Sequence, residues 1–463
     1  MSGESAYRGY RGPCVAVMQR LGFKVWSEVR IRTTRGEFEG LVLPRSETSD
    51  EHHIVLKLGT GYNIGIRHDT VLAVQELGYR EAVYKIPETA FPVDPVLPRV
   101  KLFGTGGTIA SRLDYRTGAV IPAFTPGELY GSVPELADIC NLETEKLFGI
   151  FSENMGPEQY VVLAEHVGEA IRAGYDGIVI GHGTDTMHHT AAVLSFMVQR
   201  PPVPVVMVGS QRSSDRPSSD AARNLISATW TAARGPIAEV MVCMFGPTSD
   251  RYNLLHRGTR VRKMHSSYRS TFRTLGDIPL AMVEDAVVTP LKDDWRPRRG
   301  DRDVTVQAVY DERVTILYYY PGMHPDLVDA LVDRGYRGIV IAGTGLGHVN
   351  RKIYPALERA HAAGVHMYMT LQTLWGFVQM QVYETGREIL QLGVVPLANM
   401  LPEVAFVKLG WALGVHPSDP DAVRALMTTT VAGEMTEREP HDGYLILQGA
   451  VPEIRDFLAH VWK

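Results

Sequence analysis

The chain has 463 residues, of which 45% are hydrophobic and 21% charged, and its formal net charge is −5. This length exceeds what one hydrophobic core usually spans, so we expect two or three domains. The mildly acidic balance argues against a protein that binds nucleic acid or an anionic membrane through its overall charge. The sequence contains no apolar run of about 18 residues and no N-terminal signal pattern, which favours a soluble, cytoplasmic protein without a membrane segment.

The three cysteines, Cys14, Cys140 and Cys243, lie far apart and form no Cys-x-x-Cys motif. This spacing argues against a disulfide framework and against a zinc site. We therefore expect reduced cysteines, as is usual in a cytosol.

Residues 1–85 are predicted to form an N-terminal arm, over residues 1–20, and a small β-barrel. From residue 24 onwards apolar and polar residues alternate with a period of two, as in residues 29–33 (VRIRT), and turns with glycine or asparagine separate the segments. No long helical pattern interrupts them, so short antiparallel strands are expected. Such a barrel suits either a partner-binding module or a scaffold.

A proline-rich stretch at residues 86–98 is predicted to be an extended linker. Residues 99–292 then alternate between strand and helix patterns, which predicts an α/β domain with a parallel sheet covered on both faces. The expected strands are 100–103, 177–180, 203–208 and 240–245, and the expected helices are 157–173, 190–199 and 218–233. Ligands of such sheets bind at the carboxyl ends of the strands.

A charged stretch with prolines at residues 293–308 marks a second linker. Residues 309–439 are predicted to form a smaller C-terminal α/β domain, and residues 440–463 a tail. The expected elements are strands 314–320 and 338–341, helices 325–335 and 353–363, and in the tail a strand at 444–447 and a helix at 452–461.

Two loops that carry glycine and threonine follow predicted strands: residues 104–110 (GTGGTIA) and 181–187 (GHGTDTM). Glycine allows a sharp turn and a close approach of substrate to the backbone. At neighbouring strand ends the loops would place the hydroxyls of Thr108 and Thr184 and the carboxylate of Asp185 over one crevice. This set suits nucleophilic catalysis by a hydroxyl group.

Other kinds of site fit these loops less well. A dinucleotide fingerprint would need Gly or Ala where Ile109 stands and an acid about 20 residues further on, and no P-loop motif occurs. A metal site is suggested by His182, His188 and His189 near Asp185, but their spacing differs from H-E-x-x-H and no cysteine joins them. We therefore interpret them as core or surface histidines and predict no metal.

A hydroxyl nucleophile needs a base, and residues 260–273 are rich in cations and hydroxyls. A lysine that is desolvated among cations loses its proton more readily and can act as that base. Chemistry alone does not distinguish Lys263 from its neighbours. Taken by itself, the segment would be interpreted as a solvated basic loop.

Together these motifs resemble the L-asparaginase family, over residues 99–431 and in the right order. The third motif is residues 263–273 (KMHSSYRSTFR). Residues 211–220 (QRSSDRPSSD), residues 187–192 (MHHTAA) and the N-terminal β-rich module further resemble its GatD branch, the asparaginase-like subunits of archaeal Glu-tRNA(Gln) amidotransferases. The resemblance implies a larger parallel-sheet α/β domain followed by a smaller C-terminal one.

The resemblance also assigns roles. It implies that Thr108 attacks the side-chain amide carbonyl and becomes acylated, with Tyr115 helping to activate it. Thr184, Asp185 and Lys263 match a second triad, in which the lysine draws the proton from Thr184.

For the substrate, the resemblance implies that Ser152 and Glu153 hold the α-carboxylate and α-amino groups, with Asp185 sharing the ammonium. Backbone N–H groups of the glycine loops, at Gly107 and Gly183, are suited to bind an oxyanion. Gly181 replaces a threonine common in the family, and we expect this to affect the loop only.

The implied function is hydrolysis of the side-chain amide of glutamine or asparagine, with ammonia passed to a GatE-like kinase and transamidase subunit that amidates Glu-tRNA(Gln). This chain has no nucleotide-binding motif, so no cofactor is expected in it, and ATP and Mg are expected at the partner. A homodimer core within a heterotetramer is implied. Residues 24–85 and 296–302 are candidate surfaces for the partner or tRNA.

Two other functions remain open. A free-standing asparaginase would hydrolyse its substrate without a partner or tRNA. A non-catalytic scaffold or tRNA-binding subunit would release no ammonia even with the partner present.

Overall fold

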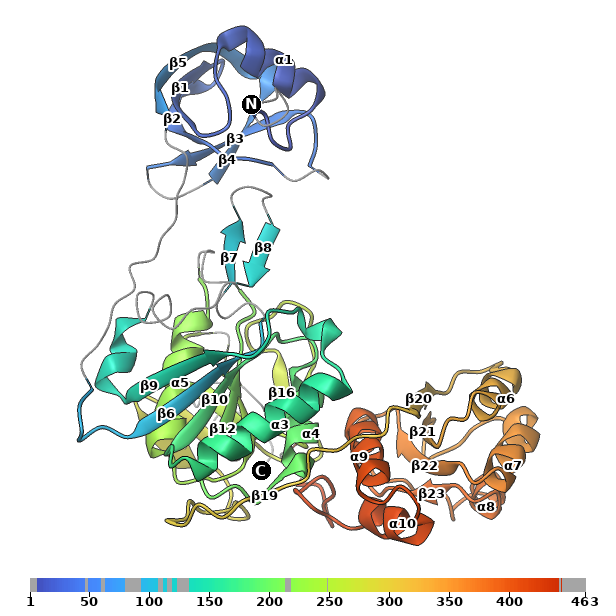
Figure 1. Cartoon of the computed structure of the whole chain (residues 1–463). Coiled ribbons are helices and arrows are strands. Elements are labelled where there is room, and N and C mark those ends of the chain that lie inside the picture. Colours follow the sequence, from blue (N-terminus) through green and yellow to red (C-terminus); the bar gives the residue numbers. More distant parts are fainter. Residues whose placement is uncertain are drawn as a thin grey trace, which may run out of the picture. The chain divides into compact units, whose positions relative to one another are not determined.

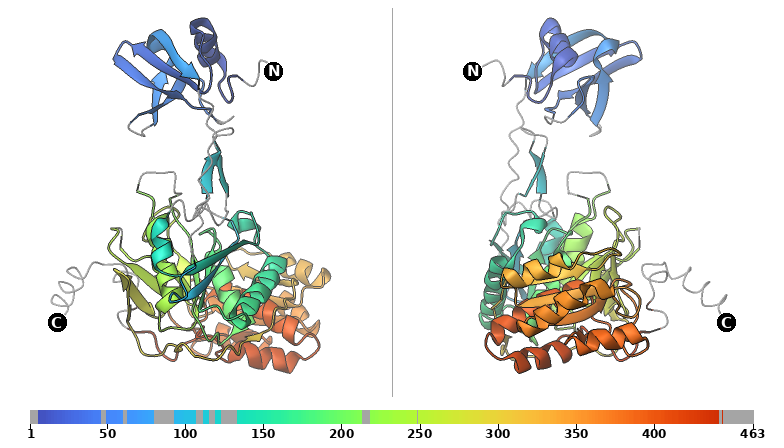
Figure 2. Two further views of the ribbon diagram at one scale, coloured as in Figure 1. Left: turned by 60° about the vertical axis from the view of Figure 1, so that its left-hand side comes forward. Right: turned by 90° about the vertical axis from the view of Figure 1, so that its right-hand side faces the viewer.

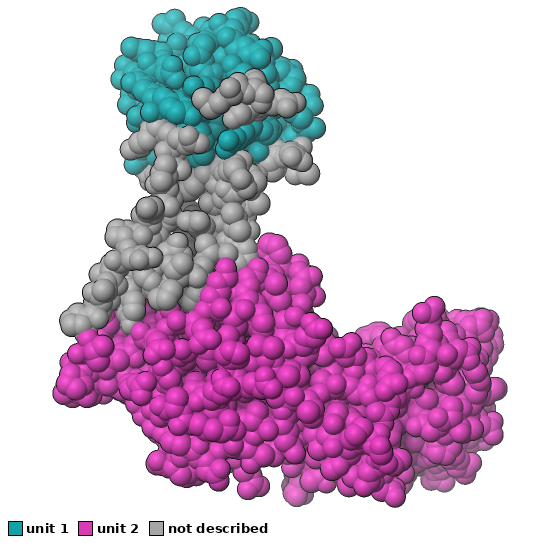
Figure 3. All heavy atoms as spheres, viewed as in Figure 1, with its two compact units in different colours: residues 1–87, 111–121 teal, residues 88–110, 122–463 magenta. Residues whose placement is uncertain are grey.

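The computed structural model describes residues 6–45, 49–59, 63–79, 93–106, 111–114, 119–122, 133–212, 218–247, 249–440 and 443. The chain divides into two compact units, residues 1–87 with 111–121, and residues 88–110 with 122–463 (Figure 3). Three predicted site residues, Gly107, Thr108 and Tyr115, lie outside the described residues, as do both predicted tail elements. Within the described part, none of the helices has the length and apolar character that a membrane span requires.

In its described part, the first unit contains a five-stranded antiparallel sheet and one α-helix (Figure 1). In sheet order the strands are β4 (Asn63–Arg67), β3 (His53–Leu58), β2 (Gly36–Val42), β1 (Ser27–Thr33) and β5 (Val71–Tyr79), and the 3-10 helix η2 (His68–Thr70) joins β4 to β5. Two register shifts between β1 and β5 help to curve the sheet. The expected period-two pattern is confirmed in β1, where Val29 and Ile31 are fully buried.

Part of the predicted N-terminal arm is instead the helix α1 (Gly12–Leu21). Apolar residues recur at helical spacing, so Cys14, Val17 and Met18 pack into the core of the small domain. A proline in its first turn and Gly22 with φ of 76° beyond its end supply ordinary start and stop signals. The prediction of an arm was therefore wrong for these residues.

The second unit begins with a larger α/β domain built on an eight-stranded sheet. In sheet order the strands are β18 (Val287–Pro290), β17 (Ala281–Glu284), β14 (Asn253–Arg257), β13 (Val240–Phe245), β12 (Val205–Val208), β10 (Gly177–Gly181), β6 (Arg99–Gly104) and β9 (Asn141–Lys146). The strands from β13 to β9 run parallel, as predicted. The parallel edge strand β9 was not predicted, and neither were the remaining three strands, which extend the sheet in antiparallel fashion.

Helices cover both faces of this sheet (Figure 1). Ile178 and Ile180 of β10 share a core with α3 (Pro157–Arg172) and α4 (Met187–Met197), whereas Val179 between them shares the opposite core with α5 (Ala221–Arg234). The central strands β10, β12 and β13 thus bury both of their faces, which explains their continuous apolar sequences.

The parallel register fixes where the loops emerge. Gly181 of β10 lies opposite Gly104 of β6, so both strands end at the same edge. The main-chain N–H and the hydroxyl of Thr105 both donate to the carbonyl of Gly181, at 3.0 Å each. Gly106 has φ of 117°, and a Cβ atom there would lie 2.1 Å from the carbonyl oxygen of Ile150, so this turn needs glycine.

The C-terminal α/β domain has a four-stranded parallel sheet, seen from another side in Figure 2. Its elements are β20 (Val314–Tyr318), α6 (Asp326–Asp333), β21 (Gly338–Gly343), α7 (Tyr354–Ala362), β22 (His366–Leu371), α8 (Glu384–Gln391), β23 (Val395–Pro396), α9 (Pro402–Val415) and α10 (Pro420–Thr428). The predicted elements of both α/β domains are present, with ends that differ by up to three residues.

Short strands and 3-10 helices lie between the larger elements. Three two-stranded sheets pair β11 (Val198–Gln199) with β19 (Thr305–Val306), β15 (Val261–Lys263) with β16 (Phe272–Thr274), and β7 (Ser111–Asp114) with β8 (Ala119–Pro122). The other 3-10 helices within the described residues are η4 (Pro134–Asp138), η5 (Ser152–Asn154) and η6 (Arg351–Ile353).

A single hydrophobic core joins the two α/β domains. Helix α9 packs on its own sheet and also on α4 of the larger domain, where the rings of Phe196 and Trp411 stack with centroids 5.6 Å apart. Inside this junction Lys408 of α9 forms a fully buried ion pair of 2.5 Å with Glu434. The same ammonium donates to the carbonyl of Thr429 at 2.7 Å.

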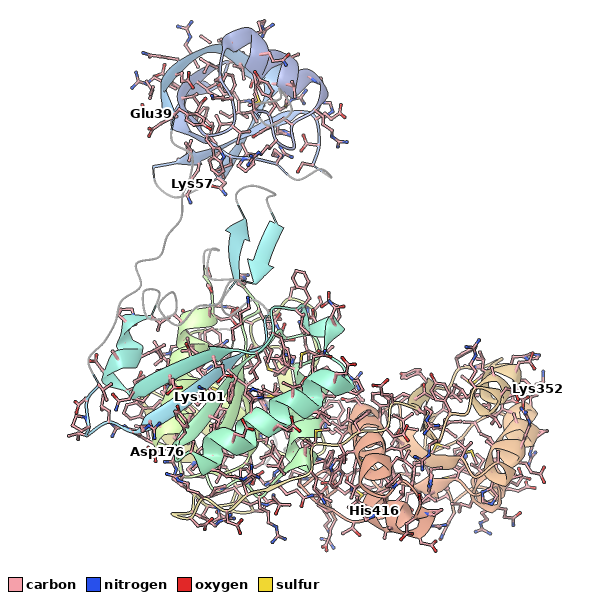
Figure 4. All side chains as sticks on the ribbon, in the orientation of Figure 1. Glu39, Lys57, Lys101, Asp176, Lys352 and His416 are labelled. Atoms are coloured by element: carbon pink, nitrogen blue, oxygen red, sulfur yellow. The ribbon has the colours of Figure 1, made fainter. Side chains whose placement is uncertain are left out.

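The basic stretch at residues 296–302 also holds the second unit together. Arg298 donates to main-chain carbonyls at the end of α5, and Arg296 donates to the carbonyl of Val431 at 2.7 Å. Arg302 pairs at 2.9 Å with Asp176, which is labelled in Figure 4. These arginines have partners within the chain. Their contacts give no support to the prediction that residues 296–302 form a surface for tRNA, which stays a prediction.

The buried pair at the junction allows a stability prediction. Lys408→Met keeps much of the side-chain volume but leaves the Glu434 carboxylate buried without its counter-ion. Breaking a buried pair from one side usually costs about 3–5 kcal/mol, so we expect the free energy of unfolding to fall by about that amount, as measured by urea denaturation. The double variant Lys408→Met with Glu434→Gln should recover part of the loss. A single variant as stable as the wild type would contradict this.

Candidate active site

Three predicted residues meet at the carboxyl edge of the larger sheet. The Nζ atom of Lys263 lies 2.9 Å from the Thr184 hydroxyl and 2.6 Å from a carboxylate oxygen of Asp185. The lysine side chain is 10% exposed and Thr184 is buried, whereas the Asp185 side chain is 69% exposed. A shielded lysine and hydroxyl therefore lie next to a carboxylate that is open to a ligand.

Different parts of the chain supply these groups. Thr184 and Asp185 lie in the loop between β10 and α4, and Lys263 ends β15, opposite Phe272 of β16. The carboxylate balances the charge of the ammonium, and the hydroxyl can accept a hydrogen bond from it. When the amine is neutral the same two atoms can pass a proton the other way, from Thr184 to Lys263.

The basic segment around Lys263 is not a solvated loop. Arg260 is fully buried, and its guanidinium donates to the carbonyls of Asn399, Glu434 and Gly276. Arg262 pairs with Glu403, and Arg269 pairs with Asp250. Arg273 donates to the carbonyls of Ser270 and Phe272. Each of these arginines thus has a structural partner. Lys263, by contrast, contacts Thr184 of the candidate site.

Three of the predicted substrate-binding residues are described. Ser152 and Glu153 lie in η5, and Gly183 lies in the loop between β10 and α4. The Thr186 hydroxyl donates to the carbonyl of Ser152 at 2.5 Å. A Cβ atom at Gly183 would lie 2.7 Å from the Cβ atom of Ser152, so the loop passes the buried serine too closely for any other residue. Glu153, next in sequence, is exposed.

The structure thus brings Ser152, Gly183, Thr184, Asp185 and Lys263 to one edge of the sheet. The loop that carries Gly107 and Thr108 leaves the same edge after Gly106, where the description of that loop ends. Thr186 was missed by the sequence analysis, although it belongs to the same GHGTDTM motif. The pair of Arg262 and Glu403 was also missed, because 141 residues separate the two and neither carries a motif.

Of the three histidines near the site, His182 makes two buried hydrogen bonds within the chain. The Nδ1–H group of His182 donates to the carbonyl of Gly183 at 2.7 Å, and its Nε2 atom accepts from Thr190 at 2.9 Å. Burial lowers the pKa of His182 to about 4 and that of His189 to about 4, and it lowers the pKa of His188 well below its usual value, so all three rings are neutral near pH 7. Among the described residues, no group of three or more His, Cys, Asp or Glu side chains is placed to hold a metal.

Comparisons with known proteins agree with this architecture. Residues 99–295 match the family profile "Asparaginase, N-terminal", and residues 313–427 match "Glutaminase/Asparaginase C-terminal domain". Residues 23–77 match "GatD N-terminal domain". The GatD protein of the glutamyl-tRNA(Gln) amidotransferase of Thermococcus kodakarensis is 50% identical over 437 residues, which cover 92% of this chain and 98% of that protein. The chain belongs to the GatD family of glutamyl-tRNA(Gln) amidotransferase subunits.

A second GatD protein, from Pyrococcus furiosus, is 47% identical over 438 residues, which cover 93% of this chain and 99% of the relative. Among solved structures, the thermostable L-asparaginase from Thermococcus kodakarensis is 33% identical, with a TM-score of 0.65, and it covers 73% of this chain and 99% of its own. These findings confirm the predicted asparaginase-like fold and the resemblance to GatD.

The pKa of His182 allows a prediction about acid stability. In the unfolded chain a histidine titrates near its ordinary pKa of about 6.5. The folded state resists protonation until about pH 4. The unfolded state therefore binds more protons between these values, so the free energy of unfolding is insensitive to this group above about pH 6.5 and falls by about 3 kcal/mol toward pH 4.

The variant His182→Gln removes this titration. Its stability at pH 7.5 should be lower than that of the wild type, because two buried hydrogen bonds change. It should then lose less of its remaining stability between pH 6.5 and pH 4.5, as measured by urea denaturation at each pH. An unchanged slope in that window would contradict the assignment of a buried, neutral His182.

Proposed function

We propose that this chain is the amide-hydrolysing subunit of a tRNA-dependent amidotransferase. It releases ammonia from the side-chain amide of glutamine or asparagine and supplies it to a partner subunit that converts Glu-tRNA(Gln) to Gln-tRNA(Gln) with ATP. The observation that carries this proposal is the contact of Lys263 with Thr184 and Asp185 in an asparaginase fold. The GatD N-terminal module supports the amidotransferase over a free-standing hydrolase.

In the proposed reaction the hydroxyl of Thr108, activated with the help of Tyr115, attacks the amide carbonyl. The C–N bond breaks, the nitrogen leaves as ammonia after gaining a proton, and the acyl group stays on Thr108 as an ester. Water then hydrolyses the ester and restores the threonine. Dividing the cleavage into two steps lowers each barrier, and main-chain N–H groups of Gly107 and Gly183 stabilise the oxyanion that forms in both.

The second triad moves protons beside this centre. We assign Lys263 as the base that takes the proton of Thr184, over the 2.9 Å between them. The resulting ammonium is stabilised by Asp185, whose carboxylate oxygen lies 2.6 Å away. Positioned acid–base partners of this kind contribute about 10²–10⁴ in rate.

Recognition of a free amino acid follows from the charges at the edge of the site. Ser152 and the adjacent backbone are proposed to hold the substrate's α-carboxylate, and the exposed carboxylates of Glu153 and Asp185 its α-ammonium. Asp185 uses one oxygen for Lys263, and its high exposure leaves room for the ammonium group at the other. A peptide lacks these two free charges and would bind less well.

The remaining assignments concern the assembly. The names of the GatD relatives support a complex with further subunits and with tRNA. We place ATP and Mg at a GatE-like partner, no cofactor in this chain, and the whole assembly in the cytoplasm, with a homodimer of this chain at the core of a heterotetramer. Residues 24–85 are the candidate surface for the partner or tRNA.

The first test compares ammonia release under different conditions. We expect the chain alone to release little ammonia from glutamine or asparagine, and the mixture with its partner and Glu-tRNA(Gln) to release much more, measured by coupled glutamate dehydrogenase assay. Rapid hydrolysis of asparagine by the chain alone, unchanged by the additions, would instead show a free-standing asparaginase. Silence of the complete mixture would favour a scaffold or tRNA-binding subunit.

A second test separates ammonia production from its use. In the complex, Thr108→Val and Lys263→Met should each lower glutamine-dependent ammonia release by at least about 10²-fold, because nucleophile and base are lost. Added ammonium chloride should still support conversion of Glu-tRNA(Gln) in both variants. Lys352→Met, at an exposed lysine in the C-terminal domain labelled in Figure 4, is the matched control and should behave as wild type. Failure of ammonium to rescue would show that assembly was damaged.

A further inference from the structure

The reacting lysine is carried by a small element outside the main sheet. Strand β15 has three residues and pairs only with β16 among the described strands, so the eight-stranded sheet does not fix it directly. A displacement of about 1 Å at a catalytic group can cost a factor of about 100 in rate. Something beyond the two-stranded sheet must therefore hold Lys263 against Thr184.

The C-terminal domain supplies that support. The side chain of Arg262, beside Lys263 in the strand, donates to a carboxylate oxygen of Glu403 at 3.0 Å. Glu403 lies in the first turn of α9, where a carboxylate is favoured by the helix dipole. At the other end of the strand, Arg260 donates to carbonyls of the same domain. The strand is thus fixed on both sides of Val261, while Lys263 reaches the opposite way to Thr184.

The arrangement is costly for stability alone. The Glu403 side chain is 5% exposed and that of Arg262 is 32% exposed, so the carboxylate loses far more hydration than its partner. Its other oxygen, Oε1, is buried without a hydrogen-bond partner among the described residues. A buried ion pair with one oxygen unsatisfied is weak evidence for a stabilising role. Its role is better explained by the strand that it holds in place.

The pair also controls charge around the lysine. Among the described residues, Asp185 from the loop after β10 and His188 from α4 lie near Lys263. Arg262 is its neighbour in the strand and lies opposite Arg273 of β16. Burial keeps His188 neutral. Glu403 is the group that cancels the charge of Arg262, one residue away from the base.

We propose that Glu403 is a positioning residue for Lys263, acting through Arg262 to hold the strand and to neutralise the neighbouring cation. The C-terminal domain thereby takes part in amide hydrolysis without touching the substrate. The inference rests on the proposed function, since it concerns the same lysine. It makes helix α9 part of the catalytic support.

The test uses the complete complex with Glu403→Gln, which keeps the side-chain shape and removes the charge. We expect kcat for ammonia release to fall about 10-fold or more while KM stays within about 2-fold, because positioning of the base and not substrate binding is lost. The matched control is Arg337→Gln, which removes another arginine–carboxylate pair of the C-terminal domain, the one with Asp311. It should keep the wild-type kcat.

Two further readouts distinguish positioning from general structural damage. The double variant Arg262→Gln with Glu403→Gln should be no slower than Glu403→Gln alone, because the two residues act through each other. In Glu403→Gln the uncompensated arginine disfavours a second cation nearby, so the ascending limb of the pH–rate profile should move to lower pH. The double variant, again neutral, should return that limb to its wild-type position.

The outcomes are separable. A wild-type complex that releases no ammonia would refute the proposed function itself. An active wild type with an equally active Glu403→Gln variant, or single losses that multiply in the double variant, would refute only the positioning role. If Glu403→Gln loses its cooperative thermal transition, Arg262→Gln, at a partly exposed side chain, carries the same prediction for kcat and KM.

Discussion

The parallel pairing of β6 with β10 is the constraint on which the candidate site depends. Because Gly104 and Gly181 lie in register, the two glycine–threonine loops leave the sheet at one edge and at one height. The hydrogen bonds from Thr105 to the carbonyl of Gly181 fasten the first loop to the second strand. A register shift would move one strand end relative to the other by a full residue spacing, so the two strands would no longer end side by side.

Charged groups then connect this edge to the rest of the second unit. Buried arginines and lysines at the domain junction use main-chain carbonyls and single carboxylates as partners, as Arg260 and Lys408 do. Such groups are expensive to desolvate unless they are paired. They restrict the ways in which the C-terminal domain can lie against the larger one. The packing of the two domains consequently also determines the position of Lys263.

Much of the architecture could be predicted from local patterns. The alternation of apolar strands and amphipathic helices predicted four of the five parallel strands of the larger sheet, and the order of motifs predicted the asparaginase-like domains. Helix α9 was missed because it is apolar on nearly every side, so residues 402–415 show little helical periodicity. The helix α1 shows such periodicity, with clear start and stop signals, and was overlooked in favour of the β pattern that follows it.

The site could be predicted only where motifs carry it. Thr184 and Asp185 share one motif, but the choice of Lys263 over its basic neighbours depended on family resemblance, since composition alone favoured a solvated loop. Its neighbours turned out to be occupied by partners that are distant in sequence, such as Glu403 for Arg262. Contacts over more than a hundred residues leave no trace in a local pattern.

The core shared by α4 and α9 has a consequence for synthesis of the chain. Helix α4 ends at Met197 and α9 begins at Pro402, so the ribosome adds about 200 residues between them, which takes about 10–40 s. Until α9 emerges, the apolar surface of α4 that it covers has no native neighbour. The nascent larger domain therefore exposes a hydrophobic surface for many seconds, and holdase chaperones would bind there.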